Sequence, residues 1–133
     1  PSADTDAATK GYVDGLVEGI SAKTSVVAAS TANISSLSSG LANGNSLDGV
    51  TLATNDRILL KDQSTASQNG IYIVQESGVP IRAPDYNTTS EIVQGTYTSI
   101  EEGNTYANKS FILTTSGAVT PNTTELIFSQ FLI

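Results

Sequence analysis

The chain has 133 residues, which suits one domain with a buried core, and it contains neither cysteine nor histidine. Disulfides, cysteine-based zinc sites and histidine general bases are therefore excluded. Six basic against thirteen acidic residues give a net charge of −7, and no apolar run is long enough to span a bilayer, so we expect no nucleic-acid partner and no membrane insertion.

Residues 1–23 carry a helical pattern that differs from the rest of the chain. Spacings of four, three and four predict a short seam for packing against copies of the chain, formed by Thr9, Val13, Leu16 and Ile20. Gly11, Gly15 and Gly19 each weaken an isolated helix by roughly 1 kcal/mol, so this helix is expected to need a packing partner. The alternative is that residues 1–23 are a frayed linker.

From residue 24 onward the pattern is that of short strands separated by turns. Apolar, β-branched or alternating runs predict strands over residues 24–29, 57–61, 71–75, 80–83, 92–100, 109–115 and 125–132. Residues 24–133 are therefore predicted to form an all-β module. We expect an antiparallel β-sandwich or small barrel of six to eight short strands, preceded by the short N-terminal helix.

Several local signals refine this arrangement. Asp48-Gly49 and Asn69-Gly70 are typical of tight turns, and residues 30–47 have the composition of a long polar loop. Pro80 predicts that the strand it begins lies at the edge of a sheet. Alternation over residues 92–100 predicts that Val93 and Tyr97 share one face, with Tyr97 packed in the core.

Two stretches resemble segments of bacteriophage tail-fibre and related virion proteins. Residues 6–14 (DAATKGYVD) resemble a segment that recurs where one fibre module joins the next. A longer set, in the same order, resembles a β-module of phage tails and fibres: residues 47–52 (LDGVTL), 55–63 (NDRILLKDQ), 68–74 (QNGIYIV), 80–83 (PIRA), 102–103 (EG) and 126–131 (LIFSQF). Residues 35–46 depart from it by being longer and more polar. The particular aromatic expected in the strand at residues 106–110 is also missing, since Tyr106 is the one aromatic there.

The resemblance implies a non-enzymatic structural module of a bacteriophage tail or fibre, which contributes to fibre assembly and host-cell attachment. It implies no cofactor and a location on the virion, exposed on the extracellular surface. The expected partners are copies of the chain, as a homotrimer, other virion proteins and a host-surface glycan. Two alternatives stay open: a carbohydrate-binding receptor-recognition domain, and a capsid decoration or head-fibre protein.

The candidate binding residues are aromatic and charged side chains near loops. Tyr86 and Tyr106 are candidate exposed aromatics for stacking on sugars, because tyrosine combines an apolar ring with a polar tip. Arg82 and Asp85 are expected to form a pair at the edge of a loop, which either binds a ligand or is a surface salt bridge.

A second charged group brackets the predicted strand 57–61 and consists of Asp56, Arg57, Lys61 and Asp62. These residues either bind an ion or a receptor or form salt bridges that fix the strand register. Glu101 and Glu102 are adjacent, so on a strand they point to opposite faces and cannot form the carboxylate pair of a glycosidase. The nucleophile-elbow and phosphate-loop motifs are also absent from the sequence, which favours a protein that is not an enzyme.

Overall fold

The computed structural model describes residues 20–131, and within them almost all regular structure is β, as the sequence predicted. Ten short strands occur in these residues: β1 (Ser21–Ala22), β2 (Ala28–Ala29), β3 (Ser46–Leu47), β4 (Val50–Thr51), β5 (Arg57–Leu60), β6 (Gly70–Ile73), β7 (Ile81–Arg82), β8 (Thr96–Ser99), β9 (Ser110–Leu113) and β10 (Phe128–Phe131). One helical turn, α2 (Leu37–Gly40), and a 3-10 turn at Ala66–Gln68 interrupt them. The predicted N-terminal helix, with Thr9, Val13 and Leu16, lies outside the described residues.

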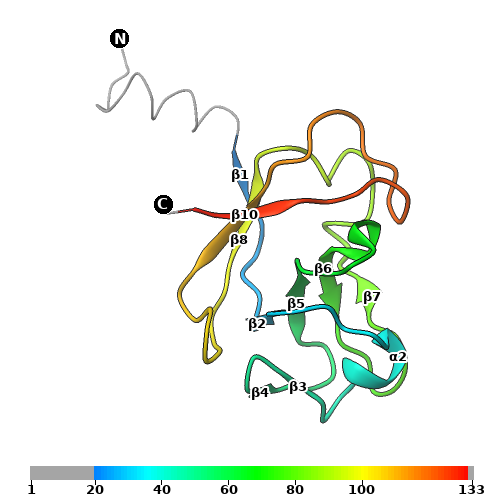
Figure 1. Cartoon of the computed structure of the whole chain (residues 1–133), viewed down its shortest axis with the longest axis vertical. Helices are drawn as coiled ribbons and strands as arrows, with labels where there is room; N and C mark the ends of the chain where they lie inside the picture. Colours follow the sequence, from blue (N-terminus) through cyan, green and yellow to red (C-terminus); the bar gives the residue numbers. More distant parts are fainter. Residues whose placement is uncertain (1–19, 132–133) are drawn as a thin grey trace.

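The strands form two four-stranded sheets and a separate hairpin (Figure 1). Sheet I has the order β1-β8-β9-β10, sheet II has the order β2-β5-β6-β7, and β3 pairs with β4. In each sheet the last three strands are antiparallel, but the first is parallel to its neighbour: β1 to β8 and β2 to β5. The predicted antiparallel pairing therefore holds for three strands of each sheet but not for the first strand, and the sheets do not close into a barrel.

Both parallel pairings come from one extended segment, residues 21–30, which we call the strap. The Ser21 N–H donates to Gly95 O, and the Val26 N–H donates to Ser99 O, both at 2.9 Å. The strap then leaves sheet I for sheet II, where the Val27 N–H donates to Arg57 O at 2.7 Å. A single run of ten residues thus supplies the edge strand of both sheets, which Figure 1 shows as the blue trace that passes from β1 to β2.

Sheet II is buried on both faces and lies between two apolar clusters. On one face, Leu59 and Ile71 pack in a cluster with Phe111 and Leu113 of sheet I. On the other face is the second cluster, in which residues of β5 and β6 join Leu41 and the β3–β4 hairpin: Ile58, Leu60, Tyr72, Leu41, Leu47 and Leu52. Burial on both faces explains why β5 is a continuous apolar run and not an alternating one.

The structure corrects the prediction for residues 92–100. The strand begins at Thr96, and its buried positions are Thr96 and Thr98, whereas Val93 is 40% exposed and Tyr97 is only partly buried. The two threonines are accommodated because their hydroxyls donate to Val93 O and Thr24 O. The alternating pattern predicted that the larger apolar side chains are the buried ones. The threonines are buried instead, because their hydroxyls have hydrogen-bond partners inside the domain.

The two turn signals had different outcomes. Asp48 and Gly49 both have positive φ, at 50° and 81°, and close the β3–β4 hairpin as the sequence predicted. Asn69-Gly70 is not a tight turn: Asn69 follows the 3-10 turn in an extended conformation, and Gly70 begins β6.

The edge position predicted from Pro80 is confirmed, because β7 is the last strand of sheet II. No helix among residues 20–131 has the length and apolar character needed to cross a membrane.

Candidate functional site

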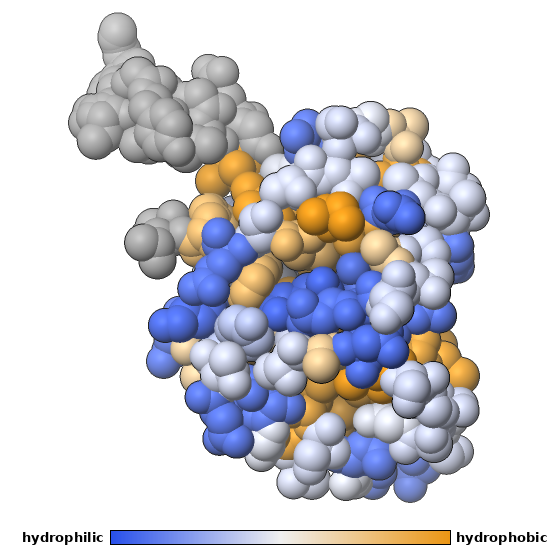
Figure 2. Space-filling view, in the orientation of Figure 1, coloured by the Kyte–Doolittle hydropathy of each residue, from blue (hydrophilic) through white to orange (hydrophobic). Residues whose placement is uncertain are grey.

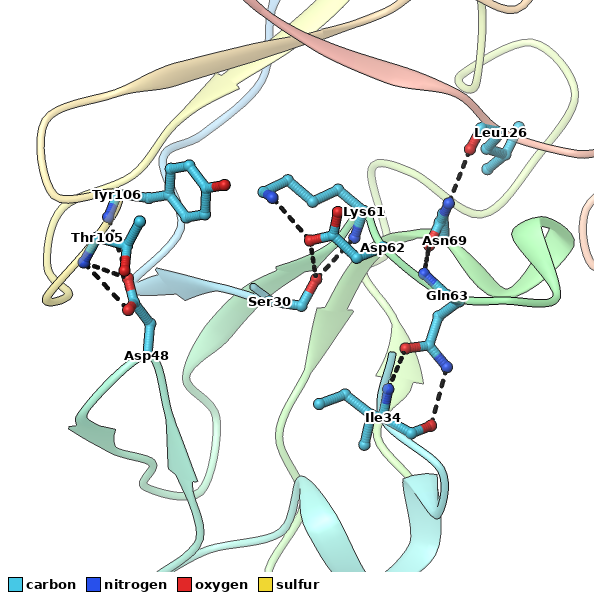
Figure 3. Close-up of polar contacts among 10 residues, drawn as sticks. All are labelled: Ser30, Ile34, Asp48, Lys61, Asp62, Gln63, Asn69, Thr105, Tyr106 and Leu126. Carbon is cyan, nitrogen blue, oxygen red and sulfur yellow. Dashed lines mark hydrogen bonds and ion pairs between the residues drawn. The ribbon is translucent and has the colours of Figure 1, made fainter. Parts of the chain in front are cut away.

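Lys61 follows β5 and is a buried cation between a carboxylate and two aromatic rings. Its side chain is only 4% exposed, and its Nζ lies 2.7 Å from the Asp62 carboxylate. The same Nζ lies 4.0 Å from the ring centre of Tyr106 and 4.7 Å from that of Phe111, and the two rings meet edge to face. Figure 3 shows Tyr106 extending toward the end of the Lys61 side chain. The charge of Lys61 therefore holds β5 against the segment that precedes β9.

Gln63 and Asn69 form a second internal polar network in the connection between β5 and β6 (Figure 3). The Gln63 side chain accepts a hydrogen bond from the Ile34 N–H and donates to Ile34 O. Its backbone N–H donates to Asn69 Oδ1, and Asn69 Nδ2 donates to Leu126 O at 2.9 Å. Three segments far apart in the sequence are fixed to one another by these two amide side chains.

Asp48 joins the β3–β4 hairpin to the loop after β8. One carboxylate oxygen accepts hydrogen bonds from the backbone N–H groups of Thr105 and Tyr106, each at 3.0 Å, and Asp48 O accepts the Asn104 N–H. Figure 3 shows the carboxylate directed at this loop. The interaction places Tyr106 in reach of Lys61, so the two contacts support each other.

Asp85 pairs with Arg57 and not with Arg82, the partner that the sequence suggested. The two guanidinium nitrogens of Arg57 lie 2.8 and 3.0 Å from the two carboxylate oxygens, and Arg57 Nε donates to Thr24 O in the strap. Desolvation alone would raise the pKa of Asp85, but hydrogen bonds and the charge of Arg57 outweigh it and lower that pKa below its ordinary value. The pairing forms because β5 and the loop after β7 are neighbours in the fold, although the two residues are distant in the sequence.

Tyr86 is not the exposed aromatic that the sequence predicted. It is 1% exposed and belongs to the cluster between the two sheets, with its hydroxyl 2.7 Å from Thr96 Oγ1. Burial raises the pKa of the Tyr86 phenol to about 12. Tyr106 is partly buried, and its ring is engaged by Lys61 and Phe111. Tyr86 therefore presents no free face for stacking on a sugar, and Tyr106 already uses its ring in contacts inside the domain.

Arg82 lies instead in an open groove beside β7, with a volume of about 770 Å³. The walls are formed by Leu37 of α2, Tyr72 of β6, Asn87 and residues from three further segments: Thr65, Ser67 and Gln68, residues 79–82, and residues 121–122. Arg82 is held by three hydrogen bonds, from Nε to Asn122 Oδ1, from Nη1 to Asn69 O and from Nη2 to Ser67 O. Sequence reasoning identified Arg82 but not the groove, because its walls come from segments with no common pattern.

The comparisons with known proteins identify no relative for this chain. No protein-family model matches the sequence, and neither curated proteins nor solved structures show significant similarity to it. Within residues 20–131 there is no group of three or more acidic side chains placed to hold a metal ion. A function for this chain must therefore be inferred from the geometry of its described residues.

Proposed function

We propose that this chain is a structural module of a bacteriophage tail or fibre, a spacer that is not an enzyme and is exposed on the virion surface. The observation that carries the proposal is that polar residues in the motif that resembles the phage module bind other parts of the domain. Arg57, Lys61, Asp62, Gln63 and Asn69 all make contacts inside the domain. Side chains used in this way maintain a shape, which is the main task of a spacer.

The strap supports the same proposal, because it suits a module that bears load along its chain. Its backbone hydrogen bonds run from Ser21, paired with sheet I, to Ser30, paired with sheet II. Arg57 Nε and Thr98 Oγ1 both donate to Thr24 O, which adds side-chain contacts near the crossing between the sheets. The strap is thus fixed to both sheets by backbone hydrogen bonds, as we expect of a segment that transmits load between modules.

The outer face of sheet I suits association with other copies. Ala22 is opposite Tyr97 in the sheet register, so the two side chains share this face, and the Tyr97 ring packs edge to face on Phe131 at 5.1 Å. Figure 2 shows hydrophobic colour gathered where Figure 1 places β1 and β10. Ile20, the last position of the predicted seam, directly precedes β1 and is partly buried. The proposed contact between copies therefore extends from Ile20 onto sheet I.

Immunoelectron microscopy of virions that contain this chain tests the proposed location. Antibodies raised against residues 20–131 are expected to label the tail or its fibres. Labelling confined to the head would replace the proposal with the alternative of a capsid decoration or head-fibre protein. Labelling of no part of the particle would contradict both.

Light scattering tests the self-association. The full chain is expected to have the mass of a trimer, and a chain that starts at residue 20, which keeps the strap, is expected to be a monomer. Tyr97→Glu in the full chain places a charge on the outer face of sheet I and is expected to weaken the trimer, whereas Val93→Glu, in the segment before β8, is the control. A monomeric full chain would contradict the homotrimer.

A further inference from the structure

The groove beside β7 differs in charge from the rest of the chain. The protein has a net charge of −7, yet no acidic side chain lines the groove, and Arg82 is its one charged residue among those described. Arg57 and Lys61 are each paired with a carboxylate, but within residues 20–131 no carboxylate lies at ion-pair distance from Arg82. Its three bonds go to neutral oxygens, which fix the guanidinium without neutralising it.

Such a fixed cation is prepared for an anionic ligand. A guanidinium has five N–H donors, so two remain after the three bonds that hold Arg82. Because the groove walls already fix the side chain, binding of a carboxylate costs little additional side-chain entropy. Gly70 leaves room for this position: a Cβ there would displace Arg82 Nη1, and its φ of 143° is one that glycine adopts readily.

The other groups in the groove are neutral hydrogen-bonding and apolar groups. Within the described residues, the hydroxyls of Thr65 and Ser67 and the side-chain nitrogens of Gln68 and Asn122 have no internal hydrogen-bond partner. Val79 and Ile81 are 50% and 58% exposed and line the same groove, on the right-hand side of Figure 1, where β7 and α2 lie. Hydroxyl and amide groups beside an exposed apolar surface fit a ring that has both hydroxyls and C–H faces.

An added peptide strand fits this edge less well. The Ala83 N–H donates to Ile71 O, and the β6–β7 register then makes Arg82 the residue whose backbone N–H and C=O point away from sheet II. The next outward position, Pro80, has no N–H to donate. A strand laid along β7 would find one complete pair of backbone partners, which is too few for recognition by strand addition.

We propose that this groove binds an acidic saccharide, with the carboxylate at Arg82 and the sugar hydroxyls at the amide and hydroxyl groups around it. This inference does not depend on the phage assignment, because it rests on the groove alone. A saccharide site outside the strap adds recognition to a module in which Arg57, Lys61, Asp62, Gln63 and Asn69 make internal contacts.

Binding of the full chain to oligomers of galacturonic acid, oligomers of sialic acid and neutral glucose oligomers tests the proposal. We expect binding to at least one acidic series and none to the neutral one. Ile81→Glu puts a carboxylate at an exposed position in the groove and is expected to weaken that binding by about tenfold or more. Ile81→Gln is the uncharged control of similar shape, and Val93→Glu adds the same charge at an exposed position outside the groove.

Three outcomes would overturn the proposal. One is that neither acidic series binds, and another is that Ile81→Glu binds as well as Ile81→Gln. The third is that a glutamate-rich peptide binds with loss in Ile81→Glu while the saccharides do not, which would assign the groove to an acidic peptide. Because virion labelling and light scattering do not involve the groove, failure here leaves the structural proposal standing.

Discussion

The ammonium group of Lys61 lies 4.0 Å from the centre of the Tyr106 ring, and this contact joins sheet II to the loop that leads into β9. It has two supports, the ion pair with Asp62 and the hydrogen bonds that the Asp48 carboxylate accepts from the backbone N–H groups of Thr105 and Tyr106. The cation and the ring are thus each held from their own side, and each support can be removed separately by substitution.

Removal of the Lys61 charge should weaken the domain. We expect Lys61→Met, which keeps most of the side-chain volume, to lower the free energy of unfolding by about 2 kcal/mol, because the cation–π contacts and the ion pair are lost together. Lys109→Met, at an exposed position, is the control and should change the free energy of unfolding by less than about 0.5 kcal/mol. Urea unfolding measures both, and equal values for the two variants would show that the buried cation contributes nothing.

Asp48 has a backbone role and a side-chain role that two substitutions separate. Asp48→Gly keeps the positive φ of the turn but loses the carboxylate, and should lower the free energy of unfolding by about 1 kcal/mol. Asp48→Ala loses the carboxylate and also strains the turn, and should cost about 2 kcal/mol. Thermal unfolding compares the two. If both variants are as stable as the unchanged chain, the hairpin is not held by this side chain.

The pairing of Asp85 with Arg57 predicts a loss of stability in acid. Folding lowers the pKa of Asp85, so the ionised carboxylate stabilises the fold fully above the ordinary pKa of 3.8. This stabilisation is lost as the pH falls below 3.8 through the lowered pKa of the folded state. Asp85→Asn should therefore be less stable than the unchanged chain near neutral pH, with a difference that shrinks below pH 3.8. Glu125→Gln, at an exposed position, is the control for general charge effects. A difference that is independent of pH would contradict the ionic pairing.

Tyr86 predicts the opposite dependence in alkali. The pKa of Tyr86 in the folded state, about 12, lies above the ordinary value of 10.0. The neutral phenol therefore stabilises the fold fully below pH 10.0, and this stabilisation is lost as the pH rises toward 12. Tyr86→Phe should reduce this alkaline loss and cost about 1 kcal/mol near neutral pH, where the hydrogen bond to Thr96 is missing. Burial also raises the pKa of Tyr72, so part of the loss should remain. Ultraviolet absorbance of tyrosinate follows the titration, and a Tyr86 that ionises near its ordinary pKa of 10.0 would contradict its burial.

Sequence patterns predicted those elements whose signal is local. The apolar run of β5, the Asp48-Gly49 turn and the edge strand after Pro80 all depend on a few consecutive residues. β2 lies within the predicted strand 24–29, whereas β1 was not predicted, and the parallel pairing of both depends on partners far along the chain. Thr96 and Thr98 were missed as buried positions because the oxygens that satisfy their hydroxyls belong to other segments.

The candidate residues illustrate the same limit. Arg82 and Asp85 are three positions apart and of opposite charge, yet each has its partner elsewhere: Asp85 binds Arg57, and Arg82 binds backbone oxygens and Asn122. Tyr86 looked exposed because its neighbours in the sequence are polar, whereas the two sheets close over its ring. Residue type and sequence neighbours therefore identified side chains that are able to form ion pairs or hydrogen bonds. Only the fold determined which partners these side chains bind.

The strap also imposes an order on folding. A parallel edge strand that begins the described chain must wait for β5 before it can pair in sheet II, and for β8 before it can pair in sheet I. Pairings of such large sequence separation are slow, because the intervening loop must close before any contact is gained. During synthesis residues 21–30 are therefore made before β5 and β8 and pair with sheet I late, and the joint between the two sheets forms only after β8 has been made.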